Sequence, residues 1–269
     1  MTNTTQIYKL VPMTNETVKY HHDLDWIALG KVAGLNPANA RVFFALMYKF
    51  KDRGTKRIVM SWDELKALSK WRGPRNIDRF QKALETILDD VVGTYIKQKE
   101  GRRVRYLALF NLFEIDGNTQ TLTAAVNPDF AYILNNLGGF YSFYQLQDFL
   151  VLKTKYGQNL FRLLREYKNK DDKGWRKIPI EWFREYMGVP KSYSTSMIAR
   201  DVINPAIVDL NQWNLFPGIQ WKYKKKPGTR GRGGKVEAVL FWWQASLFDP
   251  DEIESAQTSL PFLSDGEPE

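Results

Sequence analysis

The chain has 269 residues, of which 43% are hydrophobic and 14% aromatic; this excludes an intrinsically disordered protein and suffices for two domains with buried cores. The absence of cysteine excludes disulfide bonds and thiolate metal sites, and it fits a reducing cytoplasm. The net charge is +9, but residues 248–269 contain seven acids and no lysine or arginine, so residues 1–247 carry +16. A body this basic favours a polyanion as partner.

No apolar run approaches the length of a membrane span, and the polar start of the chain does not resemble a signal peptide. We therefore expect no membrane association.

In the first half of the chain, Asn36 and Pro37 are typical of an N-cap and a first helical position, and they open a helix that ends near Gly54. A short strand at 57–60 follows. The capping box Ser61–Glu64 then begins a short helix over Leu65 and Leu68.

After a turn at 72–74, apolar residues at helical spacing predict a longer helix with an inward face formed by Ile77, Phe80, Leu84 and Leu88. Residues 95–115 predict two strands broken at 100–101, and the turn at Gly117 leads into a third strand over 121–126. Asn127 and Pro128 predict the start of another short helix.

The second half repeats this order of elements. A helical stripe over 156–167 ends in a charged turn at 168–174, followed by a strand at 178–180 and a short helix, 181–187, closed by Gly188. After Pro190 we expect a longer helix whose inward face is formed by Ile198, Val202, Ala206 and Leu210. A basic hairpin follows.

The repeated order predicts an α+β protein made of two tandem winged-helix domains. We expect an N-terminal domain over 1–137, which makes dimer and DNA backbone contacts, and a main DNA-reading domain over 138–247. Gly138 and Gly139 are the expected hinge, and the acidic segment 248–269 is expected to be a flexible tail.

The most informative segment is the basic loop 222–235, which contains four glycines and a proline between two apolar strands. Glycine lets the backbone approach a surface closely, and the basic side chains favour a phosphate surface. A solvated charged hairpin is the alternative, but the helices beside the loop favour the wing of a winged helix. The basic residues are Lys222, Lys224, Lys225, Lys226, Arg230, Arg232 and Lys235.

Nothing in the sequence predicts catalysis. The only histidines, His21 and His22, are adjacent, and no catalytic metal motif or phosphate-binding glycine loop is present. Tyr193 as a DNA-attacking nucleophile lacks a metal site beside it, and the acidic pairs 89–90 and 171–172 are typical of solvated turns and helix ends. We expect a binding protein with no catalytic residue, metal or cofactor.

The longer helix of each half, here called the first and second reading helix, is expected to enter the DNA major groove by its N-terminal residues and outer face. Arginine reads guanine, asparagine reads adenine, and lysine and serine hold phosphates. A solvated helix face is the alternative for any single residue. The expected contacts are Arg72, Arg75, Asn76, Arg79 and Lys82 in the first half, Lys191, Ser192, Tyr193, Ser196, Arg200 and Asn204 in the second, and Lys224, Lys225, Lys226, Arg230, Arg232 and Lys235 in the wing.

Three arginines of the first half, Arg102, Arg103 and Arg105 beside Gly101, form either the wing of that half or an ordinary exposed strand edge.

Three segments of the second half resemble the iteron-binding plasmid replication initiators, the Rep family of two tandem winged helices. They are LFRLLREY (160–167), WFREYMGVPKSY (182–193) and VINPAIVDLN (202–211), the last with a proline expected to kink the helix. The resemblance covers roughly residues 20–245 and is weak in the first half. The family often has a basic run just before Val202, whereas this chain has only Arg200 there.

This resemblance implies a protein that binds repeated origin sequences (iterons) in double-stranded DNA, helps to melt a plasmid origin in a bacterial cytoplasm, and recruits host proteins such as the replicative helicase and the initiator ATPase. It also implies a monomer–dimer equilibrium in which dimers repress their own promoter. A winged-helix transcriptional repressor is the alternative function, and a nickase comes third.

Two short segments near the end of the chain look like the peptides with which bacterial replication proteins bind the sliding clamp. A glutamine amide can bond the rim of a pocket while leucine and phenylalanine fill an apolar cleft, and two weak copies on one tether add by avidity. The expected clamp-binding residues are Gln244, Ser246, Leu247, Phe248, Gln257, Leu260 and Phe262. Leu247 and Phe248 could instead simply end the last strand.

Overall fold

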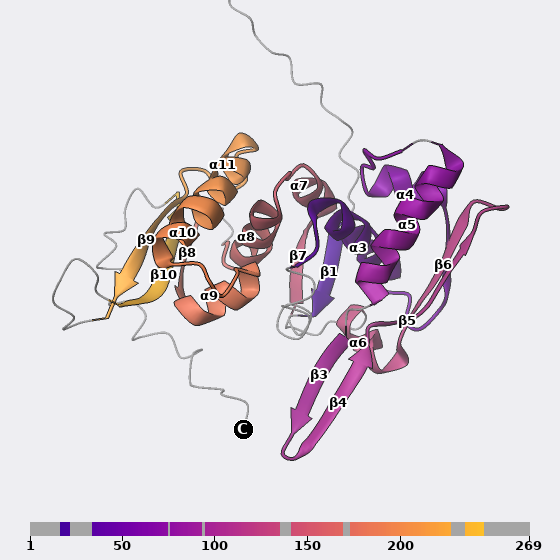
Figure 1. The fold of residues 1–269 in the computed structure, drawn as a ribbon, viewed down its shortest axis with the longest axis horizontal. Coiled ribbons are helices and arrows are strands. Elements are labelled where there is room, and N and C mark those ends of the chain that lie inside the picture. The colour runs from indigo at the N-terminus through magenta and orange to yellow at the C-terminus, as the bar shows by residue number, and fades with distance from the viewer. Residues whose placement is uncertain are drawn as a thin grey trace, which may run out of the picture.

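The computed structural model describes residues 17–21, 34–74, 76–92, 95–134, 141–168, 173–226 and 235–244. Figure 1 shows two lobes of mixed helix and strand that lie side by side and are joined through α7 and α8. The elements of the first half are β1 (Thr17–His21), α3 (Pro37–Phe50), β2 (Ile58–Ser61), α4 (Trp62–Leu68), α5 (Ile77–Val92), β3 (Tyr95–Glu100), β4 (Arg103–Ala108), β5 (Phe110–Asp116), β6 (Thr121–Val126), the 3₁₀ turn η1 (Pro128–Phe130) and α6 (Ala131–Leu134).

The second half repeats the order of elements, as predicted. Its elements are β7 (Tyr141–Gln145), α7 (Leu146–Leu150), α8 (Lys155–Arg165), β8 (Gly174–Pro179), α9 (Ile180–Met187), α10 (Thr195–Ile198), the π-turn η2 (Ala199–Ile203), α11 (Asn204–Gln212), β9 (Gln220–Lys225) and β10 (Val236–Trp243). The first reading helix is α5, and the second is α10, η2 and α11 together.

Each half contains one three-stranded antiparallel sheet, and the two sheets have the same strand order. In the first the order is β2-β6-β5, and in the second it is β8-β10-β9. In both, the strand before the two helices pairs with the last strand of the closing hairpin. This is the winged-helix arrangement, and it makes β5–β6 and β9–β10 the two wings.

Local caps explain where the helices begin. Asn36 Oδ1 accepts hydrogen bonds from the amides of Ala38 and Asn39 at the start of α3, and Ser61 Oγ accepts one from the amide of Glu64 at the start of α4. Helix α9 ends at Gly188, whose φ of 60° is the left-handed conformation that glycine adopts without strain.

Two sequence predictions of element bounds and one of a helix's inward face were wrong. Residues 95–116 form three strands, because the chain leaves the β3–β4 ribbon at the buried Leu109 without a glycine or proline turn. Ile77 is 45% exposed, and Ile87 and Val91 complete the inward face of α5 in its place. Strand β8 begins at Gly174, well before the predicted 178.

The second reading helix starts at Thr195, where Ser194 Oγ caps it, and contains the π-turn just before Pro205. Its buried residues Ile198, Val202, Ala206 and Leu210 recur every four positions, so in a regular α-helix they would drift by about 40° at each step. The π-turn, closed by a bond from the Asn204 amide to the Ala199 carbonyl, winds more slowly and keeps these four side chains on one face. Pro205 follows this turn almost directly and has no N–H to donate. The kink expected at this proline is therefore found as a π-turn just before it.

The two halves share one continuous core. Strand β1 pairs with β7 along its whole length, and the buried Arg162 of α8 lies among aromatic rings of both halves. Its guanidinium carbon is 4.8 Å from the ring centre of Phe44 and 5.7 Å from that of Tyr186, and its Nε donates to Tyr20 Oη at 3.2 Å. Of the predicted domains, the limit at 137/138 stays a prediction, and Gly138, Gly139 and the tail 248–269 lie outside the described residues.

A buried carboxylate attaches the second reading helix to α8. Asp209 of α11 accepts hydrogen bonds at Oδ2 from the amides of Lys153 and Thr154 and from Thr154 Oγ1, at 3.0, 2.8 and 2.8 Å. Gly157 packs so closely against this group that a Cβ there would lie 2.4 Å from Asp209 Oδ2.

Replacing Asp209 by alanine should therefore lower the free energy of unfolding by about 3 kcal/mol, because buried N–H donors lose a charged acceptor. Urea denaturation of the full chain measures this decrease. Asp89→Ala, which removes an exposed acid from α5, is the matched control and should change stability by no more than about 0.5 kcal/mol. Equal stabilities of the two variants would contradict the role given to Asp209.

Candidate nucleic-acid interface

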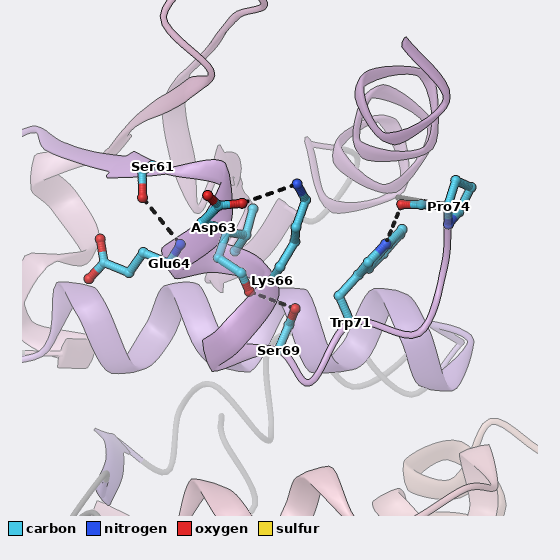
Figure 2. A network of polar contacts seen from close by, with 8 residues as sticks. Ser61, Asp63, Glu64, Lys66, Ser69, Trp71 and Pro74 are labelled. Atoms are coloured by element: carbon cyan, nitrogen blue, oxygen red, sulfur yellow. Dashed lines mark hydrogen bonds and ion pairs between the residues drawn. The ribbon is translucent and has the colours of Figure 1, made fainter. Parts of the chain in front are cut away.

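The turn between α4 and α5 presents the start of the first reading helix, and Figure 2 shows how it is held. Trp71 Nε1 donates to the Pro74 carbonyl at 3.2 Å, and the indole packs edge-on against Phe80 of α5. Gly73 passes directly over this ring, since a Cβ there would lie 2.4 Å from the indole. These contacts hold the turn in place, and Arg72 within it is exposed to solvent.

The described predicted residues of the first half lie on this turn and on the outer face of α5. Asn76, Arg79 and Lys82 are all exposed, in agreement with an outward face. Asn76 Oδ1 accepts a hydrogen bond from the Arg79 amide, so the asparagine caps α5. Arg75 lies outside the described residues.

Sequence reasoning missed Arg41, which lies with Arg72 at one pocket of about 270 Å³. The other lining residues are Ala38, Ser69, Trp71 and Gly73. Burial, and then the nearby positive charge of Arg72, lowers the pKa of Arg41. Two guanidinium groups at one pocket favour an anionic occupant. The signal was invisible in the sequence because Arg41 belongs to α3, whose pattern predicts only a core helix.

In the second half, the predicted residues before the reading helix form a compact turn. Lys191 and Ser192 are exposed, while Tyr193 is half-buried against the core and its carbonyl accepts a hydrogen bond from Arg184 Nη2 at 2.6 Å. Ser196, in the first turn of the helix, is exposed, and its Oγ lies 2.9 Å from that of Ser194. Lys191, Ser192 and Tyr193 therefore precede the helix instead of forming part of it.

Two predicted base-reading residues of this helix, Arg200 and Asn204, are exposed, and each interacts with another side chain of the protein. Arg200 forms a two-point ion pair with Asp201, which raises the pKa of Arg200 and lowers that of Asp201. Asn204 Oδ1 accepts a hydrogen bond from the indole of Trp221 in β9 at 3.2 Å. The role of Asp201 was not foreseen from the sequence, because neighbouring residues of a helix do not ordinarily face one another.

The wing strand β9 is fastened to the second reading helix by its aromatic residues. Tyr223 Oη donates to the Thr195 carbonyl at 2.6 Å, and Trp221 contacts Asn204 on the same side. Because side chains alternate along a strand, Lys225 shares this side, whereas Lys222 and Lys224 lie on the opposite face of the sheet. There Lys224 is close to Lys177 of β8, and burial followed by this second lysine lowers the pKa of Lys224.

The base of the wing is closed by a hydrogen bond from the Lys226 amide to the Lys235 carbonyl, and both side chains are exposed. Arg230 and Arg232 lie outside the described residues. So do Ser246, Leu247, Phe248, Gln257, Leu260 and Phe262 of the predicted clamp peptides. Gln244, the residue after β10, has a φ of 51°, and its amide donates to the Pro217 carbonyl at 3.1 Å.

The wing of the first half is not basic. Its turn contains Asp116, whose pKa is lowered by hydrogen bonds from Thr119 and Asn118. Arg102, Arg103 and Arg105 belong instead to the β3–β4 ribbon, which is a separate two-stranded sheet that projects from the body in Figure 1. The first of the two interpretations of these arginines is therefore wrong, because the strand order assigns the wing to β5–β6.

In the part of the chain that is described, no three metal-ligating side chains come together, and no helix has both the length and the apolarity to cross a bilayer.

Family models match both halves. The family described as "Initiator Replication protein, WH1" matches residues 17–165, more than half of the chain, and "Initiator Rep protein, WH2" matches residues 179–243. The chain belongs to the initiator replication protein family. This confirms the resemblance seen in the sequence and the two tandem winged helices.

Two known proteins that resemble this chain agree with the family assignment. A "Probable replication protein rep" of Bifidobacterium longum (strain NCC 2705) is 29% identical over 200 residues, which are 72% of this chain and 64% of that protein's length. The crystal structure of "Pi initiator protein in complex with iteron DNA" superposes with a TM-score of 0.66 over 85% of this chain and 97% of that one. Its sequence identity is 14%, so the likeness is one of fold.

The hydrogen bond from Tyr223 of the wing to the second reading helix predicts that stability depends on pH. Burial raises the pKa of Tyr223 to about 12, so the folded protein holds the phenol proton more tightly than the unfolded chain does. The resulting stabilisation is complete below pH of about 10 and is lost as the pH rises towards about 12. Tyr223→Phe should cost about 1 kcal/mol at pH 8, and its difference from wild type should shrink above pH of about 10. Urea denaturation from pH 8 to pH 11 measures this difference; a constant value would contradict it.

Proposed function

We propose that the protein is a plasmid replication initiator that binds repeated origin sequences in double-stranded DNA, helps to open the origin and recruits host replication proteins. The observation that carries this proposal is that two winged helices of the initiator family each present exposed basic residues on a reading helix or on the turn before it. In this proposal the protein binds DNA and host proteins and catalyses no reaction itself. The solved relative of the same fold is described as a complex with iteron DNA.

The two halves contribute differently to the proposed DNA contact. The second half has a basic wing beside its reading helix, so it supplies both phosphate contacts and the base-reading Arg200. The wing turn of the first half contains Asp116 and no basic residue. The positive charge of this half is concentrated instead at Arg41, Arg72 and α5. We therefore assign sequence reading mainly to the second half and backbone contacts to the first.

Footprinting of the full chain on the DNA that flanks its gene tests this function. We expect protection of tandem direct repeats spaced by about two helical turns. A single inverted repeat in the promoter, without direct repeats, would instead support the alternative, a winged-helix transcriptional repressor. An initiator whose dimer represses its own promoter would protect both the direct repeats and the inverted repeat.

The wing should supply affinity more than specificity. Replacing Lys225, Lys226 and Lys235 by glutamine should lower the slope of log affinity against log salt by about 0.9 for each phosphate that the wing no longer neutralises, and by a similar amount on every sequence. The same charge removed at Lys51, Arg53 and Lys56, in the loop after α3, is the matched control and should leave the slope nearly unchanged. Binding by wild type that is insensitive to salt would overturn the assignment.

We further propose that the segments 244–248 and 257–262 bind the bacterial sliding clamp. The first segment begins at Gln244, the residue that directly follows β10, the last strand of the wing hairpin. Replacing Leu247, Phe248, Leu260 and Phe262 together by alanine should abolish capture of the protein by purified clamp, while alanine at Ile253 and Ser255, between the two segments, should not. Clamp capture that survives the fourfold change contradicts this proposal. Contacts with the replicative helicase and the host initiator ATPase are a further part of the proposed recruitment.

A further inference from the structure

The pair Arg200–Asp201 occupies the middle of the second reading helix, in the π-turn η2. The side chain of Arg200 is 73% exposed and that of Asp201 is 32% exposed. A carboxylate on a DNA-facing helix is unfavourable by itself, because it repels phosphate. Its presence beside the only arginine of this helix therefore requires a physical reason.

The geometry of the pair supplies one. Arg200 Nε donates to Asp201 Oδ1 at 2.6 Å, and Nη2 donates to Oδ2 at 2.8 Å. This side-on contact uses two of the five N–H groups of the guanidinium. Both N–H groups of Nη1 and the second of Nη2 remain, and they form the end-on fork that matches O6 and N7 of guanine. The carboxylate thus grips one edge of the guanidinium and leaves the base-reading edge open.

The position of Arg200 in the helix suits a base contact. Arg200 follows Thr195, the first residue of the second reading helix, by five positions. Long side chains of a helix lean towards its N-terminal end, which is where a reading helix meets the base edges. Because the ion pair is exposed, it contributes little to stability, and its effect is to orient a side chain that otherwise has many rotamers.

We infer that Asp201 is a positioning residue for base recognition: it holds Arg200 as a fixed fork that reads one guanine in each repeat. This inference rests on the proposed function, because it requires DNA in the groove of the second domain. It differs from a simple charge effect, since removal of an acid by itself strengthens binding to every sequence.

The test measures discrimination instead of affinity. Binding of the full chain to the footprinted repeat is measured by fluorescence anisotropy, with each guanine in turn replaced by 7-deazaguanine, which lacks the N7 acceptor. For wild type we expect one guanine at which this replacement weakens binding about 10-fold, as for a bidentate arginine contact. Arg200→Ala should abolish that penalty. Asp201→Ala should reduce it to about 3-fold or less, and Asp201→Asn, which keeps the shape and one acceptor, should fall between.

Glu181→Ala, which removes an exposed acid from α9 of the same domain, is the matched control. It should raise affinity for all sequences at low salt while leaving the guanine penalty at its wild-type value. Urea denaturation should give all variants nearly the same stability, because neither Glu181 nor the Arg200–Asp201 pair is buried.

The outcomes separate the two levels of the proposal. An Asp201→Ala variant that keeps the full guanine penalty, whatever its affinity, overturns the positioning role and leaves the proposed function intact. A repeat that is protected but shows no Arg200-dependent guanine does the same. The absence of any sequence-specific protection overturns both.

Discussion

The buried guanidinium of Arg162 fixes how the two winged helices sit against each other. It belongs to α8, but its closest ring, Phe44, belongs to the first half, and Tyr186 belongs to the second. A buried cation is unfavourable unless its surroundings compensate for the water it gives up, and aromatic faces with a hydroxyl acceptor do so here. Any rotation of one lobe against the other would remove part of this compensation.

Helix α8 consequently acts as the frame on which both reading helices are mounted. At its start Thr154 holds Asp209 of α11, and Gln158 Nε2 reaches the Pro37 carbonyl at the start of α3, which packs against α5. The distance between the two reading helices is thus set by a single rigid element and its buried polar bonds. For the DNA contact proposed for both halves, this spacing matters as much as either contact surface.

Local signals predicted most of the fold, while the long-range polar contacts were out of reach. Asn36, Ser61 and Gly188 act on their own neighbours in the chain, so caps and periodicity located the helices and the order of elements. The extra strand after Leu109 escaped because the chain changes sheets there without a turn residue. Arg162 and Asp209 read as polar positions of amphipathic helices, and their partners lie 142 and 55 residues away. Arg41 was not predicted for the same reason, because it meets Arg72 only in the folded chain. Basic composition identified the candidate surface, but only the fold showed that Arg200 already has a partner.

The π-turn in the second reading helix has a consequence for how the protein can change over evolution. It divides the helix into two segments with separate rotational phase, since Ser196 precedes the π-turn and Val208 and Asn211 follow it. Removing or adding one residue between them would rotate one segment against the other by about 100°. The length of this segment is therefore constrained even where residue identity is free, so that the helix can accept substitutions on its outer face but not single-residue insertions or deletions.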